Sequence, residues 1–198
     1  MQTIICMKWG SRYGPEFVNR LYTSVKRHTK KTTKVYCFTD DFKGIDKNVI
    51  SKPLPPINLP DIISLTPWRK LSIWQFPLYD LTGDVLFLDL DLVITNNLDR
   101  FFDYKPGHYC VIENWTQLGK NIGNTSCFRI PVGKYHSIFK HFEDDPVKIW
   151  KKYHIEQTYL SDNNFFGHLN GVKFLNIIFF QNGLLGFGNQ QCFQLKQA

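Results

Sequence analysis

The run Val85–Leu88 is apolar at every position, and it constrains the fold more than any other stretch of this sequence. A strand with one face in water alternates apolar and polar residues, so an unbroken run predicts a central strand covered on both faces. A similar run, Thr3–Met7, precedes a helical apolar spacing over Pro15–His28 and a further run at Val35–Thr39. This succession of strand, helix and strand predicts an α/β fold.

The middle of the chain is less regular. Asn48–Pro67 contains five prolines and no helical period, so we expect it to wind over the surface. Thr66 and Pro67 are typical of an N-cap and a first helical position, which predicts a helix over WRKLSIWQF that ends at Pro77. The elements expected further on are a short helix at 98–102, strands at Tyr109–Ile112, Ser126–Ile130 and Phe174–Phe180, and helices at Lys134–Phe142 and Val147–Tyr153.

Length and composition suit a single folded domain. A chain of 198 residues with 43% hydrophobic content can bury a substantial core. We therefore expect one domain over residues 1–198, in which 166–198 form a divergent or shortened C-terminal part.

The N-terminus lacks a basic segment followed by an apolar one, so no signal peptide is expected. Five scattered cysteines predict reduced thiols, and hence a cytoplasmic protein.

The net charge of +7 indicates an anionic partner: nucleic acid, an anionic membrane face or an anionic small substrate. The densest basic run, Lys26–Lys34, has no interleaved aromatic residues and no Gly-rich RNA-binding signature, so no nucleic-acid partner is expected. The run reads mainly as the solvated C-terminal end of a helix, where the helix dipole favours cations. The alternative interpretation of this basic run is peripheral contact with an anionic membrane.

Two aspartates, Asp89 and Asp91, directly follow the central apolar run. Side chains alternate along a strand, so both carboxylates are expected on the same side, while Leu88, Leu90 and Leu92 point to the core. Open α/β sheets bind their ligands at strand ends. Such a pair is half of a site for Mg²⁺ or Mn²⁺, which takes carboxylate and phosphate oxygens. The plainer alternative is one turn-capping and one solvated aspartate.

Two enzyme classes place an Asp-x-Asp motif after an apolar strand: nucleotide-sugar glycosyltransferases of the GT-A fold and haloacid-dehalogenase-type phosphatases. FLDLDLVIT, with Val93 and Thr95, fits the phosphatase pattern locally. The phosphatase motif normally opens its domain, however, whereas here two strands, a helix and a proline-rich loop come first. Asp144 and Asp145, the candidates for its second carboxylate pair, lie in a polar EDDP turn. The phosphatase is therefore the less favoured reading.

The sequence resembles bacterial GT-A glycosyltransferases and, distantly, the glycogenin-type retaining family. The similarity is greatest to an uncharacterised bacterial group with an MKWG…YG…VN…LY start, and it covers Thr3–Leu160. It rests on several motifs that occur in the same order, namely the KWG…YG…VN start, FTDD, WRKLSIW, LFLDLDLVI, NTSCF and a late EQ pair. The resemblance implies a single GT-A domain, a Rossmann-like α/β structure with a mixed central sheet.

The resemblance also implies which residues bind the donor. Met7, Lys8, Trp9 and Tyr13 lie in the loop where the family binds the nucleoside; the two aromatic rings offer stacking faces, and Lys8 offers charge to phosphate. The alternative for these rings is plain core packing. Further donor residues implied in this way are Asp40 at the base or ribose, Lys70 at the phosphates, and Asn124 and Ser126 at the sugar, with Asp89 shared between donor and metal.

Glu156 and Gln157 match a family Asp-Gln pair near the reacting carbon of the sugar, and they are the catalytic candidates. Glu156 is one methylene longer than the family's aspartate. Asp89 and Asp91 would hold Mn²⁺ or Mg²⁺, and His168 in GHLNG is a weak candidate for a third ligand.

The function implied is transfer of a sugar from a nucleotide-diphosphate sugar, UDP-sugar by preference, to a glycan or lipid-linked glycan acceptor in lipopolysaccharide or capsule synthesis. A basic protein in this role would work at the inner face of the cell membrane. The alternative of another class is a non-catalytic relative that binds sugar nucleotides. It is motivated by Glu156 and by the short segment that follows it.

Overall fold

Four parallel strands build the first half of the central sheet in this computed structural model, which describes residues 1–162, 173–175, 177–178 and 191–195. They are β1 (Gln2–Lys8), β2 (Thr33–Thr39), β3 (Ile50–Lys52) and β4 (Asp84–Leu88). β1 pairs in parallel with β2 on one side and with β4 on the other. The apolar runs in three of these strands are the ones predicted, because strands buried on both faces leave a clear local signal.

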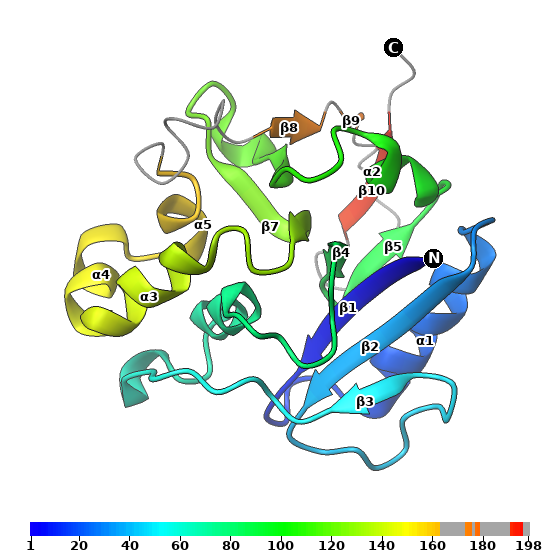
Figure 1. Cartoon of the computed structure of the whole chain (residues 1–198), viewed down its shortest axis with the longest axis horizontal. Coiled ribbons are helices and arrows are strands. Elements are labelled where there is room, and N and C mark those ends of the chain that lie inside the picture. The colour runs from blue at the N-terminus through cyan, green and yellow to red at the C-terminus, as the bar shows by residue number, and fades with distance from the viewer. Residues whose placement is uncertain (163–172, 176, 179–190, 196–198) are drawn as a thin grey trace.

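The second half makes the sheet mixed, as expected. β7 (Gly123–Pro131) pairs antiparallel with both β4 and β6 (Cys110–Glu113), and β8 (Lys173–Leu175) pairs in parallel with β6. The seven-stranded order is β3-β2-β1-β4-β7-β6-β8 (Figure 1). A smaller three-stranded sheet joins β5 (Leu92–Ile94), β10 (Gln191–Leu195) and β9 (Ile177–Ile178).

Helices cover both faces of the central sheet. α1 (Pro15–Arg27) and α2 (Asp99–Asp103) pack on the cluster that contains Ile4 and Leu86. The opposite cluster contains Ile5 and Phe87. The helices that pack on this second cluster are η1 (Asp61–Ile63), η2 (Pro67–Trp74), α3 (His136–Asp144), α4 (Pro146–Tyr153) and α5 (Glu156–Tyr159). Figure 1 shows α1 on one side of the molecule and α3, α4 and α5 together on the other. No helix in the described ranges is long and apolar enough to cross a membrane.

Three expectations are corrected. The helix begins at Pro67 as predicted, but it is a 3₁₀-helix, and the Thr66 hydroxyl donates back to the Ile63 carbonyl at 2.7 Å instead of capping. The irregular segment contains two short elements that its sequence does not signal, β3 and η1. The strand expected over 174–180 is two short strands in different sheets, and residues 176 and 179–180 of it lie outside the described residues. A further short 3₁₀-helix, η3 (Trp115–Gln117), follows β6.

The cysteines with described side chains are free and buried, namely Cys6, Cys37, Cys110 and Cys127. This agrees with the expectation of reduced thiols. A hydrogen bond with its neighbour Cys37 and burial raise the pKa of the Cys6 thiol, so Cys6 acts as a small apolar side chain of the core.

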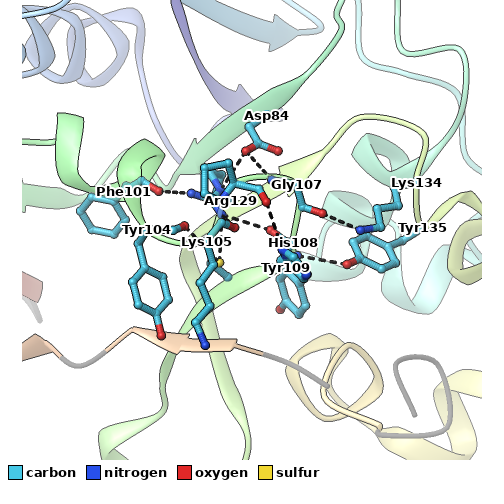
Figure 2. Close-up of polar contacts among 12 residues, drawn as sticks. Asp84, Phe101, Tyr104, Lys105, Gly107, His108, Tyr109, Arg129, Lys134 and Tyr135 are labelled. Carbon is cyan, nitrogen blue, oxygen red and sulfur yellow. Dashed lines mark hydrogen bonds and ion pairs between the residues drawn. The ribbon is translucent and has the colours of Figure 1, made fainter. Parts of the chain in front are cut away.

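One fully buried cation, Arg129 on β7, lies between the start of β4 and the segment that leads from α2 to β6 (Figure 2). Its guanidinium donates to the carbonyls of Phe101 and Lys105 and, at 3.4 Å, to that of His108. Its Nε lies 3.5 Å from Oδ2 of Asp84, which also accepts from the Gly107 amide at 2.9 Å. Arg129 thereby joins β7, β4 and the α2–β6 connection. Because three of its acceptors are backbone carbonyls, and its side-chain partners Asp84 and Cys110 are distant in the chain, the sequence carries no pattern that predicts this cluster.

Candidate functional site

The site begins where the strand order changes direction. The chain runs from β1 through α1 to β2, continues to β3, and then returns to place β4 on the other side of β1. Phe87 of β4 pairs with Ile5 of β1, and continuing this register brings Asp89 level with Met7. The carboxyl ends of β1 and β4 therefore lie next to each other at a topological switch point. This is the position where open α/β sheets bind ligands.

A cavity of about 370 Å³ opens at this switch point. It brings together six of the predicted residues, Met7, Trp9, Tyr13, Lys70, Asp89 and Asp91. Six further residues line the cavity that were not predicted from the sequence, namely Gly10, Ser11, Arg12, Leu65, Pro67 and Leu90. Arg12 could have been recognised, since it lies within the same Gly- and aromatic-rich loop as Trp9 and Tyr13. The volume is in the range of small-molecule sites.

Asp89 meets a buried cation. Lys70, on η2 and only 4% exposed, donates from Nζ to Oδ2 of Asp89 at 2.8 Å. Burial alone would lower the pKa of the Lys70 ammonium, but the charges of Asp89 and Glu156 outweigh it and raise that pKa. Burial also raises the pKa of the Asp89 carboxyl in spite of the bond from Lys70. Helix η2 thus places the positive charge of Lys70 in the wall of the cavity.

Asp91 meets a hydroxyl from the loop that follows β1. Tyr13 donates to Oδ2 of Asp91 at 2.8 Å. Burial and this bond raise the pKa of Tyr13 to about 12, so the phenol stays protonated and acts as a donor at neutral pH. Leu90 between the two aspartates is buried. Both carboxylates line the cavity, as expected, but Leu90 lines it too, because residues 89–91 follow the end of β4 and do not continue the strand.

The loop 9–13 is held by two further hydrogen bonds. The Gly10 amide donates to Oδ2 of Asp40 at 2.8 Å, and the Trp9 indole donates to the Leu65 carbonyl at 3.4 Å. Gly10 has a φ of +62°, a conformation that favours glycine. Asp40 ends β2 at the expected sheet edge, but there its carboxylate holds the loop and does not line the cavity. Lys8 is likewise buried at the end of β1 and does not line the cavity.

A buried polar network runs from the cavity wall toward α5. Lys70 Nζ also donates to the Thr125 carbonyl at 3.3 Å, and the Thr125 hydroxyl donates to Oε1 of Glu156 at 2.6 Å. Glu156 is buried at the start of α5. The two predicted catalytic residues, Glu156 and Gln157, contact different partners. Oε1 of Gln157 accepts a hydrogen bond from the side-chain amide of Asn114 at 3.0 Å. Neither side chain lines the cavity, so Glu156 reaches the cavity only through Thr125 and Lys70.

Asn124 and Ser126 lie on β7 next to Asp89. The Ser126 carbonyl accepts from the Asp89 amide at 2.8 Å, and Oδ1 of Asn124 accepts from the Ser126 amide at 2.9 Å. Asn124 is buried. The two residues flank the acidic pair, although they are not among the residues that line the cavity.

The acidic pair suits a hard divalent cation. Mg²⁺ and Mn²⁺ are commonly held by one or two carboxylates together with substrate phosphates. Asp89 and Asp91 offer two such groups on one cavity wall, and Tyr13 engages only one oxygen of Asp91. No cluster of three or more His, Cys, Asp and Glu side chains that could hold a metal occurs within the described residues. The weak third candidate, His168, lies outside them.

No family model matches the sequence, and no curated protein matches it. Solved structures do match. The galactosyltransferase LgtC, solved with donor and acceptor sugar analogues, superposes with a TM-score of 0.63 at 16% identity over 88% of this chain and 73% of LgtC. The chain has the GT-A-type fold of such glycosyltransferases. The glycosyltransferase GlyE of Streptococcus pneumoniae TIGR4, in its apo form, superposes with a TM-score of 0.59 at 17% identity.

The GlyE superposition covers 88% of this chain but only 45% of GlyE, so the chain spans less than half the length of that structure. The predicted fold class, a single GT-A-like α/β domain with a mixed central sheet, is confirmed. At these identities the likeness concerns the fold, and the activity is argued from the site.

Proposed function

We propose that this GT-A domain is a metal-dependent glycosyltransferase that moves a sugar from a nucleotide-diphosphate sugar, UDP-sugar by preference, to a glycan acceptor. The single observation that carries the proposal is the convergence of Asp89, Asp91 and Lys70 on one cavity at the switch point of the sheet. We place the chain among bacterial relatives of the glycogenin-type retaining family.

The charges of the cavity support a diphosphate ligand. Asp89 and Asp91 are opposed by Lys70 and Arg12, so the lining is neutral overall. The diphosphate of a nucleotide sugar carries two negative charges, which one divalent cation would balance. Asp91, helped by Asp89, would hold Mn²⁺ or Mg²⁺, and the metal when bound supplies Lewis-acid stabilisation of the leaving nucleotide. Lys70 adds a preorganised charge at the same oxygens.

The remaining donor contacts follow from the surroundings of the cavity. Trp9 and Tyr13 offer rings to a nucleobase, Met7 adds apolar surface, and Asp40 fixes the loop that carries them. Lys8, which is buried and does not line the cavity, is assigned to the nucleotide phosphates from the family resemblance alone. Asn124 and Ser126, beside Asp89, are assigned to the donor sugar, and the pair formed by Glu156 and Gln157 to the neighbourhood of the reacting carbon.

Three further assignments complete the proposal: an acceptor on a surface glycan such as lipopolysaccharide or capsule, a cytoplasmic location, and contact with the inner face of the membrane. Exposed cations at the end of α1 and just after it support the last of these, namely Lys26, Arg27, Lys30 and Lys34. We expect the protein to bind anionic vesicles at low salt and to leave them as salt screens the charges. Sedimentation with vesicles measures this, and absence of binding at low salt would refute the membrane contact.

The central test is calorimetric titration of UDP with Mn²⁺ and with EDTA, on the natural chain and on Asp91→Asn. We expect Mn²⁺ to strengthen UDP binding about tenfold or more, a usual size for coupled ligands. Asp91→Asn should abolish this strengthening, because the amide keeps the shape of the side chain and removes its charge. The matched control is Asp144→Asn, on an exposed residue of α3 far along the chain from the cavity loops.

The outcomes separate the alternatives. UDP binding without any metal effect would refute metal dependence, and no binding of UDP or other nucleotides would refute the donor site. Metal-dependent binding without transfer to any acceptor or water would favour the non-catalytic relative. The phosphatase reading has lost support, because Asp145 caps α4 by accepting from the Lys148 amide at 2.9 Å and Asp144 is exposed.

A further inference from the structure

The hydrogen bond between Tyr13 and Asp91 joins two segments that are 78 residues apart in the chain. Tyr13 belongs to the loop that carries the nucleobase-facing rings, and Asp91 is the main proposed metal ligand. The bond also differs in kind from the two other tethers of the loop. Gly10 and Trp9 donate to Asp40 and to the Leu65 carbonyl, neither of which is assigned to the metal.

The position of the Tyr13 ring is fixed by its own neighbours. Its ring lies edge-on to Phe17 at 4.8 Å, one turn into α1, and the Arg12 guanidinium lies 5.3 Å from its centre. With the ring held in this way, the hydroxyl reaches Asp91 at 2.8 Å. Hydrogen bonds to a carboxylate are roughly twice as strong as bonds between neutral groups. The hydroxyl therefore orients the Asp91 carboxylate and selects the oxygen that remains available.

We propose that Tyr13 is a positioning residue whose hydroxyl couples the nucleoside loop to the metal ligand Asp91, so that cation and nucleotide each strengthen the binding of the other. This inference rests on the proposed function. A cation at Asp91 would favour the carboxylate orientation that Tyr13 already holds, and the loop that carries Tyr13 would be favoured in return. The effect is reciprocal by thermodynamic necessity.

The variant that isolates the hydroxyl is Tyr13→Phe, which keeps the ring for stacking. In the absence of nucleotide, we expect the affinity for Mn²⁺ to fall about tenfold, the lower end of what partners of metal ligands contribute. Electron paramagnetic resonance of free Mn²⁺ measures this directly. The strengthening of UDP binding by Mn²⁺, measured as the ratio of the UDP affinities with Mn²⁺ and with EDTA in the same variant, should shrink by the same factor of about ten.

Tyr22→Phe is the matched control, since Tyr22 lies on α1, the helix that follows the loop of Tyr13, and does not line the cavity. It should leave both affinities and the coupling unchanged, and circular dichroism compares the folded state of the three chains. Unchanged or tighter Mn²⁺ binding in Tyr13→Phe, with the coupling intact, would overturn this inference while leaving the proposed function in place. A natural chain that binds neither Mn²⁺ nor UDP would overturn both.

Discussion

Lys70→Met should lower the free energy of unfolding by about 3 kcal/mol, the lower end of the cost of breaking a buried ion pair. Methionine fills nearly the same space, so the loss comes from charge. Lys70 bonds Asp89 at 2.8 Å and the Thr125 carbonyl at 3.3 Å, and the charge of Glu156 adds to its stabilisation. Without the ammonium, two carboxylates lose their cation. We use the lower end because the Asp89 side chain is 22% exposed.

Under the proposed function, the same variant should weaken UDP binding at least about tenfold, because it removes the preorganised charge that Lys70 would offer to the phosphates. Urea unfolding followed by circular dichroism measures the stability, and calorimetry measures the binding in the folded range. Lys26→Met, on an exposed residue in the last turn of α1, controls for the general effect of removing one positive charge. Full UDP binding in a folded but destabilised variant would make Lys70 a structural residue alone.

Arg129→Met should cost about 4 kcal/mol, within the range for removing one partner of a buried charged network. The guanidinium is fully buried, and its loss leaves the carbonyls of Phe101 and Lys105 without their donor and Asp84 without its counter-charge. For a chain of this length the melting temperature should fall by roughly 8–16 °C. Because none of these residues lines the cavity, UDP affinity in the folded range should not change.

Thermal unfolding measures the Arg129 effect, with Arg27→Met at an exposed position of α1 as its control. The result distinguishes the roles of two buried cations, Lys70 and Arg129. Lys70 is expected to affect stability and binding together, and Arg129 to affect stability alone. A loss of UDP affinity in Arg129→Met at temperatures where it is folded would contradict this separation.

The sequence predicts what leaves a local pattern. The apolar runs of β1, β2 and β4 and the spacing of α1 were sufficient for an α/β fold, and the strand-end rule was sufficient to place Asp89 and Asp91 at a ligand site. Lys70, on a helix, was placed at the same site only by the family resemblance. The 3₁₀ geometry of η2 was not predictable, because its sequence also suits an α-helix. The bond from Tyr13 to Asp91 and the role of Asp40 depend on contacts between distant segments. The burial of Glu156 against Thr125 depends on how α5 packs, which no local spacing reports.

The three hydrogen bonds that hold loop 9–13 determine how much of the chain would have to be transferred to move this loop into another protein. The acceptors that shape this loop are Asp40 after β2, the Leu65 carbonyl before η2 and Asp91 after β4. Residues 9–13 transplanted alone into another protein would carry the aromatic rings but none of the groups that hold them. The smallest transferable unit therefore extends from β1 to Asp91, so exchanging nucleotide preference between relatives means exchanging nearly half of the chain.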